Sequence, residues 1–156
     1  MTEQEILTLF DRFHRDVYRL AYSYTGNRAD AEDVTQETFL RLVEKQPQLI
    51  PGKEKAWLLQ VCANACKNLR RSPWRSRVVP MEAAGEPAFA YEPQSALFEA
   101  VMTLSPKERL VVHLHYYEGY GLEEICAMLR LPLSTVSMRL HRARTKLKQL
   151  RLEEYL

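Results

Sequence analysis

The chain has 156 residues, 46% of them hydrophobic and 27% charged, with a formal net charge of +2, which is the composition of one ordinary or two small globular domains. Its charged, amphipathic start lacks the apolar run of a signal peptide, and no segment approaches the roughly 20 apolar residues of a membrane span. We therefore expect a soluble cytoplasmic protein. Cys62, Cys66 and Cys126 form an odd set without ligand spacing, which disfavours a disulfide framework or a zinc site, and core packing is expected for Cys62 and Cys66.

The charge is unevenly distributed along the chain. Residues 61–80 carry 5 basic and no acidic groups, and residues 130–156 carry 7 basic and 2 acidic groups, whereas the stretch between them carries 2 and 8. Two basic blocks in a nearly neutral chain predict two separate anion-binding surfaces.

The first part of the chain has the apolar spacing of three helices, predicted over residues 6–24, about 30–45 and about 54–71. Gly26 interrupts the first pattern, and the Asp30 carboxylate is predicted to accept hydrogen bonds from the first turn of the second helix. The third helix is predicted to bury a stripe made of Leu58, Cys62, Ala65 and Leu69.

From Ser72 to Gln94 the helical pattern fails and four prolines interrupt the chain, which predicts a flexible linker. So long a connection favours an all-α protein of two small helical domains. We predict the domains over residues 1–72 and 95–156, with the linker over residues 73–94.

Four helices are predicted in the second domain, over about residues 95–102, 106–119, 122–130 and from 134 onward. Ser105 and Glu108 form a capping box at the start of the second of these, with a proline at its first position. Pro132 is predicted to end the third helix, because the residue before a proline avoids helical geometry, and Ser134 to cap the fourth. The fourth helix repeats apolar residues at Val136, Leu140, Ala143, Leu147 and Leu150.

The last two of these helices, one short and one longer, have the layout of a helix-turn-helix, whose second helix enters the major groove of DNA. Residues 131–151 contain six Arg and Lys residues and no acid. The alternative is a solvated helix face, but such a face usually mixes charges of both signs.

The helix predicted over residues 54–71 carries a second, polar stripe. It consists of Gln60, Asn64, Lys67 and Arg71, flanked by Trp57 and Asn68. An aromatic ring, amides and cations together suit single-stranded nucleic acid. The alternatives are that Trp57 belongs to the core and that Asn64 caps or bridges a neighbouring helix.

The helix predicted over residues 30–45 has two different faces. Its inward face is predicted to hold Ala31, Val34, Thr38 and Leu42, and its outward face Asp33, Gln36, Glu37 and Leu40. An exposed leucine among polar groups is compatible with a partner-binding surface, and a solvated face with one exposed leucine is the alternative.

Three segments of the chain are informative together. The first is DAEDVTQETFLRL, the second is AWLLQVCANACKNLRR, and the third is LSPKERLVVHLHYYEGYGLEEICAMLRLPLSTVSMRLHRARTKLKQL. Together they resemble a known family, the ECF (extracytoplasmic-function) group of bacterial sigma-70 initiation factors. The first is similar to the core-polymerase-binding helix of that group, the second to its promoter-melting helix and the third to its helix-turn-helix segment. The three occur in the order and at the spacing of the family and cover nearly all of both domains.

The resemblance implies a sigma factor that directs RNA polymerase to promoters, which is not an enzyme and needs no cofactor or small-molecule substrate. It implies docking on the clamp helices of the largest polymerase subunit through Asp33, Gln36, Glu37 and Leu40, and a second contact with the polymerase flap. It implies contacts with the minus-10 element by Lys53, Trp57, Asn64, Lys67, Asn68 and Arg71. It implies contacts with the minus-35 element by Ser134, Thr135, Ser137, Met138, His141 and Arg142, with Arg139, Arg144 and Lys146 nearer the phosphates. An anti-sigma factor is the expected regulatory partner.

The chain departs from the family pattern at several positions of the helix-turn-helix. Relatives often have glycine where this chain has Arg130 and Ser134, and a basic residue followed by serine where it has Ser137 and Met138. We therefore expect a promoter preference of its own. The alternative function is a helix-turn-helix transcriptional regulator with an N-terminal sensing or dimerisation domain.

Overall fold

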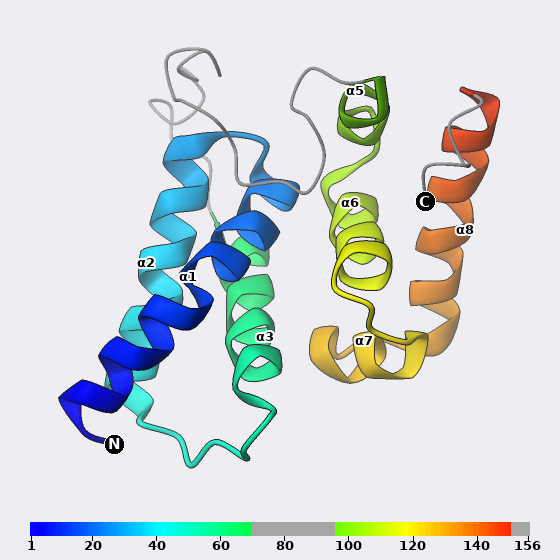
Figure 1. The fold of residues 1–156 in the computed structure, drawn as a ribbon. Coiled ribbons are helices and arrows are strands. Elements are labelled where there is room, and N and C mark those ends of the chain that lie inside the picture. Colours follow the sequence, from blue (N-terminus) through cyan, green and yellow to red (C-terminus); the bar gives the residue numbers. More distant parts are fainter. Residues whose placement is uncertain (70–95, 151–156) are drawn as a thin grey trace. The chain divides into compact units, whose positions relative to one another are not determined.

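The computed structural model describes residues 1–69 and 96–150, and within these ranges all regular structure is helical, which confirms the all-α prediction. The chain divides into two compact units, Met1–Ala88 and Phe89–Leu156, as expected for two small domains (Figure 1). The limits predicted for the linker, residues 73–94, lie outside the described residues and stay a prediction. None of the described helices is both long and apolar enough to cross a membrane.

In its described part, residues 1–69, the first unit has three helices that pack on one another in pairs, α1 (Glu3–Thr25), α2 (Arg28–Lys45) and α3 (Glu54–Lys67) (Figure 1). Each helix contributes fully buried side chains to one core, and the largest of these are Val17, Leu20, Tyr22, Leu42, Leu58 and Leu59. Burial of such side chains supplies most of the favourable free energy of folding. The predicted inward face of α2 is confirmed, because Ala31, Val34, Thr38 and Leu42 are all buried.

The helix boundaries of the first unit follow its capping residues. Gly26, with a left-handed φ of 72°, ends α1 as predicted. The predicted start of α2 near Asp30 is wrong by two residues, because the side chain of Asn27 caps the helix by accepting a hydrogen bond of 2.8 Å from the Asp30 amide. The Asp30 carboxylate instead accepts a hydrogen bond from the Asn27 side-chain amide.

The helix α3 ends at Lys67, earlier than the predicted Arg71, and buries a wider face than the predicted stripe. Leu58 and Cys62 are buried as predicted, whereas Ala65 and Leu69 are only half-buried. The face is wide because α3 packs against both α1 and α2, so that Leu59, Ala63 and Cys66 are buried as well. The predicted packing of Cys62 and Cys66 in the core is confirmed.

The second unit contains α5 (Ala96–Met102), α6 (Pro106–Val112), η1 (His113–Tyr117), α7 (Leu122–Leu129) and α8 (Leu133–Gln149). The helices α6 and α8 run side by side, with α7 across one end of the pair (Figure 1). The predicted capping box is confirmed. The Ser105 hydroxyl accepts from the Glu108 amide at 3.2 Å, and the Glu108 carboxylate accepts from the Ser105 amide at 3.0 Å.

The helix that begins at Pro106 changes its geometry at His113, which the sequence does not predict. The segment η1 is a π-helical turn, closed by a hydrogen bond of 3.0 Å from the Glu118 amide to the His113 carbonyl. A π-helical turn holds an extra residue, so the side chains after it are rotated relative to an uninterrupted α-helix. The segment ends at Tyr117 with Glu118 as its C-cap, and the next residue, Gly119, has a left-handed φ of 82°.

The turn between α7 and α8 depends on Arg130. This residue has the left-handed φ of 55°, and both its amide and that of Leu131 donate to the Cys126 carbonyl. The helix therefore ends before Pro132, as predicted, but through a left-handed C-cap. Because glycine adopts this conformation without a steric penalty, a glycine at this position, as the resemblance leads us to expect, would fit the same cap.

The first residue of α8 is Leu133, and its N-cap is Pro132, so the predicted capping role of Ser134 is wrong. The Pro132 carbonyl accepts hydrogen bonds from the Thr135 and Val136 amides, which starts the helix before Ser134 is reached. At the other end, Leu150 is 49% exposed, in contrast to the earlier members of its apolar repeat.

Candidate nucleic-acid interface

The helix α8 has one buried and one exposed face. Val136, Leu140, Ala143 and Leu147 are buried against the rest of the second unit, as predicted. The opposite face carries most of the predicted base-reading residues. Ser134, Met138, His141 and Arg142 are exposed, and Thr135, Ser137 and Arg139 are half-buried. The helix thus presents a mainly polar surface to the solvent, with the large apolar side chains of Leu133 and Met138 exposed in its first half.

Two of the predicted phosphate-binding residues make contacts inside the second unit. The Arg144 guanidinium lies 5.5 Å from the centre of the Tyr116 ring, and its Nε donates a hydrogen bond to the Tyr116 hydroxyl. The Lys146 ammonium lies 2.7 Å from a carboxylate oxygen of Glu108. These contacts connect α8 to η1 and to α6.

Glu108 is the most enclosed acid of this interface, with a side chain that is only 7% exposed. Burial by itself would raise the pKa of its carboxyl group, but the hydrogen bonds from Lys146 and from Ser105 together lower the pKa below its ordinary value of 4.5. The carboxylate is therefore held in its charged form by the two groups that it joins.

The predicted minus-10 residues lie along α3 and at its two ends. Lys53 precedes the first turn of α3 and is exposed, and Trp57 and Asn64 are half-buried along the helix. Lys67 and Asn68 are both exposed, and Asn68 is the C-cap residue. Arg71 lies outside the described residues. The described members form a partly exposed surface of mixed aromatic, amide and cationic character, which suits an unstacked base and its phosphate.

The predicted polymerase-binding residues share the outer face of α2. Asp33, Gln36 and Leu40 are exposed, and the Glu37 carboxylate lies 2.9 Å from the guanidinium of Arg41. Leu40 has an exposed fraction of 55%, although a leucine of this helix would be stabilised by burial.

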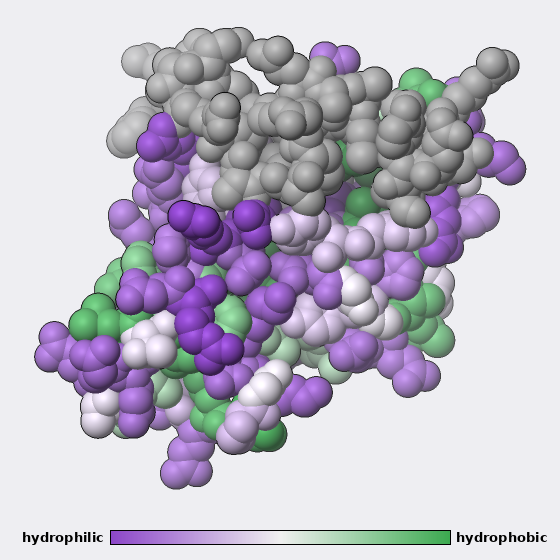
Figure 2. All heavy atoms as spheres, viewed as in Figure 1, coloured by the Kyte–Doolittle hydropathy of each residue, from purple (hydrophilic) through white to green (hydrophobic). Residues whose placement is uncertain are grey.

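The sequence left open that Leu40 is a single exposed apolar residue, but the structure shows that it is one of several. Val43, Leu7 and Phe10 are also exposed large apolar side chains, and Figure 2 shows hydrophobic side chains among polar ones at the surface of the first unit. The Phe10 ring packs edge-on against that of Phe39, with ring centres 5.0 Å apart, so α1 and α2 both contribute to this region. The spacing of three residues between Leu40 and Val43 was the available signal in the sequence.

Comparison with known protein families gives matches in both units. The family model of sigma-70 region 2 matches residues 9–76, and that of sigma-70 region 4 matches residues 100–149. Over 149 residues the chain is 36% identical to the ECF RNA polymerase sigma factor SigE of Mycolicibacterium smegmatis. The aligned region covers 88% of this chain and 58% of SigE. The chain is 32% identical to the ECF RNA polymerase sigma factor SigL of Mycobacterium tuberculosis, with 86% of this chain and 82% of SigL covered.

The fold is similar to that of two solved structures. One is the sigma factor RpoE of Bartonella quintana in complex with the anti-sigma factor NepR, with a TM-score of 0.67 and 24% identity over 95% of this chain and 94% of the other. The second is CnrH in complex with the cytosolic domain of CnrY, with a TM-score of 0.65 and 23% identity over 96% and 88%. Family matches in both units favour a sigma factor over a regulator that has only a helix-turn-helix. The chain belongs to the sigma-70 family of RNA polymerase sigma factors, in its ECF group.

Proposed function

We propose that this chain is a promoter-specificity subunit, which binds core RNA polymerase and directs it to particular promoters. The observation that carries the proposal is the presence of sigma-70 regions 2 and 4 in this order in one chain, each with its own exposed surface. The chain spans 58% of the length of SigE and 82% of that of SigL. The proposed function therefore rests on regions 2 and 4, which this chain contains. Because RNA polymerase acts in the bacterial cytoplasm, the proposal implies a cytoplasmic location.

The outer face of α2 would bind the clamp helices of the largest polymerase subunit. Asp33, Gln36 and Glu37 would supply polar contacts and Leu40 an apolar one, and the neighbouring Val43 would enlarge the apolar part. Interfaces of this kind combine an apolar centre with a polar rim. The second unit would contact the polymerase flap, and neither contact requires a catalytic group.

The surface of α3 would hold the opened minus-10 element. Trp57 offers an aromatic face for stacking, Asn64 and Asn68 offer amides to base edges, and Lys53 and Lys67 offer cations to phosphates; Arg71 belongs to the same proposal. Stacking of a single base on an aromatic ring contributes about 1–3 kcal/mol, which is enough to offset part of the cost of melting.

The exposed face of α8 would read the minus-35 element in the major groove. Ser134, Thr135, Ser137 and His141 can form hydrogen bonds with base edges, Met138 can contact the methyl group of thymine, and Arg142 and Arg139 can bind a guanine edge or a phosphate. Since phosphate contacts position a protein without reading sequence, the specificity would come from the polar and apolar residues of the first half of the helix.

Transcription in vitro tests the proposal directly. The full chain, core RNA polymerase and a library of promoter sequences should yield transcripts from a defined subset with shared minus-35 and minus-10 elements. Replacement of Asp33 and Gln36 by alanine should abolish binding to core polymerase, while Glu123→Ala, which removes an exposed carboxylate from α7, should not. A chain that activates no promoter of the library and does not bind core polymerase is not a sigma factor.

An anti-sigma factor is the second proposed partner. The similarity in fold to the sigma factor RpoE, which was solved with the anti-sigma factor NepR, supports the proposal. The exposed apolar residues beside α2 would give such a partner a surface that overlaps the polymerase site. Copurification from the native host should recover a protein that competes with core polymerase, and a chain that is active and free of such a protein there would contradict this partner.

A further inference from the structure

Arg144 and Lys146 differ from the other basic residues of α8 in what they contact. We propose that Arg144 and Lys146 are positioning residues that fix the orientation of α8 within its domain, instead of binding the phosphates of promoter DNA. The inference rests on the proposed function, in which the exposed face of α8 reads the minus-35 element. It reassigns two residues for which the sequence pattern alone predicts contacts with the DNA backbone.

The two residues lie on opposite edges of the buried face of α8. Successive residues of an α-helix are rotated by about 100°, so Arg144 and Lys146 are separated by about 200° around the helix axis. Between these two edges lie the buried residues of α8, Ala143 and Leu147 among them. One edge is bound to η1 through Tyr116 and the other to α6 through Glu108. Contacts on both edges resist rotation of the helix about its own axis. The buried apolar face alone would resist this rotation less, because apolar contacts have no preferred direction.

The contact of Lys146 also pairs its charge with that of Glu108, although the Lys146 side chain itself is 46% exposed. Its ammonium lies 2.7 Å from Glu108, whose side chain is 7% exposed and whose pKa is lowered, so the pair carries no net charge near neutral pH. A move of Lys146 to a phosphate would leave an enclosed carboxylate without its cation, which is unfavourable.

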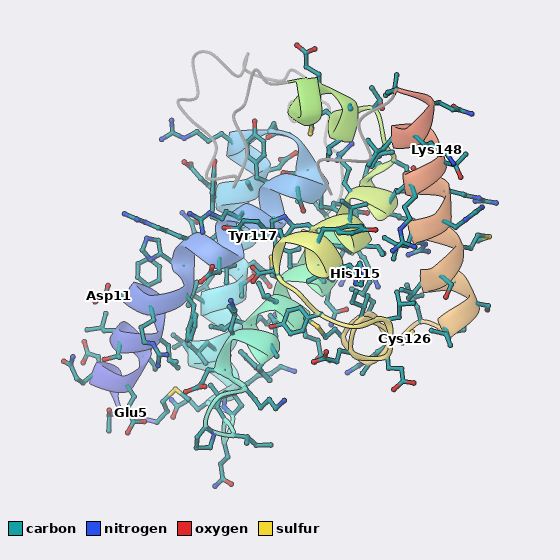
Figure 3. The ribbon with its side chains drawn as sticks, turned by 45° about the vertical axis from the view of Figure 1, so that its right-hand side comes forward. Glu5, Asp11, His115, Tyr117, Cys126 and Lys148 are labelled. Atoms are coloured by element: carbon teal, nitrogen blue, oxygen red, sulfur yellow. The ribbon has the colours of Figure 1, made fainter. Side chains whose placement is uncertain are left out.

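The contact of Arg144 is of a different kind, with a similar consequence. Its guanidinium lies over the Tyr116 ring and donates to the hydroxyl group of the same residue. The π-helical turn η1 contributes to this arrangement, because it sets the direction in which Tyr116 leaves the helix. By contrast, in the described parts of the chain Arg142 and Lys148 have no ion-pair partner and are exposed; Lys148 is labelled near the end of α8 in Figure 3.

The salt dependence of DNA binding distinguishes positioning from phosphate contact. The affinity of the full chain for a duplex with its selected minus-35 element is measured at several salt concentrations by fluorescence anisotropy. Log affinity falls linearly as log salt rises, and each lost phosphate contact should reduce the steepness of this fall by about 0.9. We expect Lys146→Ala to leave the steepness unchanged, and the matched control Arg142→Ala to reduce it. A decrease of about 0.9 for Lys146→Ala overturns the inference.

Glu108→Gln gives a test with the opposite sign. A glutamine preserves the capping box, since its side-chain oxygen can still accept from the Ser105 amide, but it removes the charge that holds Lys146. The freed ammonium should then become available to a phosphate, and the steepness with which log affinity falls against log salt should increase by up to about 0.9. A steepness that stays the same or decreases in this variant contradicts the proposed pairing.

A positioning role also predicts a loss of selectivity that a purely stabilising role does not. At a temperature where circular dichroism shows the variant to be folded, Lys146→Ala should reduce the ratio of specific to non-specific duplex affinity several-fold, and Lys146→Arg should restore it. For the other edge, Tyr116→Phe retains the ring but removes the acceptor of Arg144, and should reduce the same ratio. An unchanged ratio in both variants overturns the inference. A wild-type chain without any sequence preference overturns the proposed function as well, whereas a wild-type preference with a reduced steepness for Lys146→Ala overturns this inference alone.

Discussion

The left-handed conformation of Arg130 predicts that a glycine at this position stabilises the second unit. With a φ of 55° and a ψ of 48°, the Cβ of Arg130 lies close to the backbone, which costs a non-glycine residue about 1–2 kcal/mol. Glycine avoids this cost but loses more backbone entropy on folding, by about 0.5–1 kcal/mol. The net gain expected for Arg130→Gly is therefore about 0.5–1 kcal/mol, which for a domain of this size raises Tm by about 3–6 °C.

Two matched variants separate the backbone from the side chain. Arg130→Ala removes the same charge without relieving the left-handed strain, so it should not stabilise the unit. Gly119→Ala should have the opposite effect, because Gly119 has a φ of 82° and an added Cβ would meet no atom within 4 Å, which leaves only the conformational penalty. We expect it to destabilise the unit by about 1 kcal/mol.

Amide hydrogen exchange on the full chain measures these effects in the second unit alone. Peptides that cover α7 and α8 should exchange more slowly in Arg130→Gly and faster in Gly119→Ala, with Arg130→Ala close to the wild type. Thermal unfolding followed by circular dichroism gives the change in Tm. Unchanged or faster exchange in Arg130→Gly would contradict this prediction, since it would mean that the left-handed cap is not strained or that the Arg130 side chain itself stabilises the turn.

Three further predictions concern titration, base recognition and thiol reactivity. Because the folded-state pKa of Glu108 is lowered, its contribution to stability is present above its ordinary pKa of 4.5 and is lost as the pH falls through the folded-state value; acid titration of stability should therefore be flatter in Glu108→Gln. If Met138 contacts a thymine methyl group, replacement of that thymine by deoxyuridine should weaken wild-type binding roughly fourfold, from about 0.8 kcal/mol for one buried carbon, and should not affect Met138→Ala. The pKa of the Cys66 thiol is raised by its hydrogen bond with Cys62 and by burial. Iodoacetamide should therefore label the partly exposed Cys126 on α7 (Figure 3) faster than Cys62 or Cys66, as measured by peptide mass spectrometry. Faster labelling of Cys66 would contradict this.

Local signals in the sequence were sufficient for most of the secondary structure. The capping box at Ser105, the glycine after the first helix and the apolar repeat of the last helix each act within one or two turns. The structure confirms all three, except that Leu150, the last member of the repeat, is exposed. The errors are also local in kind. Asn27 and Pro132, and not Asp30 and Ser134, are the N-caps, because several polar residues near a helix start can compete for the same amides and only the final backbone conformation selects one.

The candidate surfaces were predictable as faces of helices but not as sets of contacts. Helical periodicity correctly assigned Leu40 and Met138 to exposed faces. It could not show that Phe10 is exposed, since Phe10 has the spacing of a core residue, nor that the buried face of α3 is wide enough to include Leu59 and Ala63. Exposure at these positions depends on which helices lie next to them, and that arrangement is set by packing over long sequence distances.

The helices, the division into two units and the chemical character of each surface follow from propensity, periodicity and charge over short spans, so the amino-acid sequence is enough to predict them. Which basic residues of α8 are paired within the domain, and which are free to bind a partner, depends instead on how the helices pack. Lys146 and Glu108 are 38 residues apart, and Arg144 and Tyr116 are 28 apart, so no local pattern connects them. Their pairing arises because α8 packs along α6 and η1, which brings opposite charges and an aromatic ring within hydrogen-bond distance.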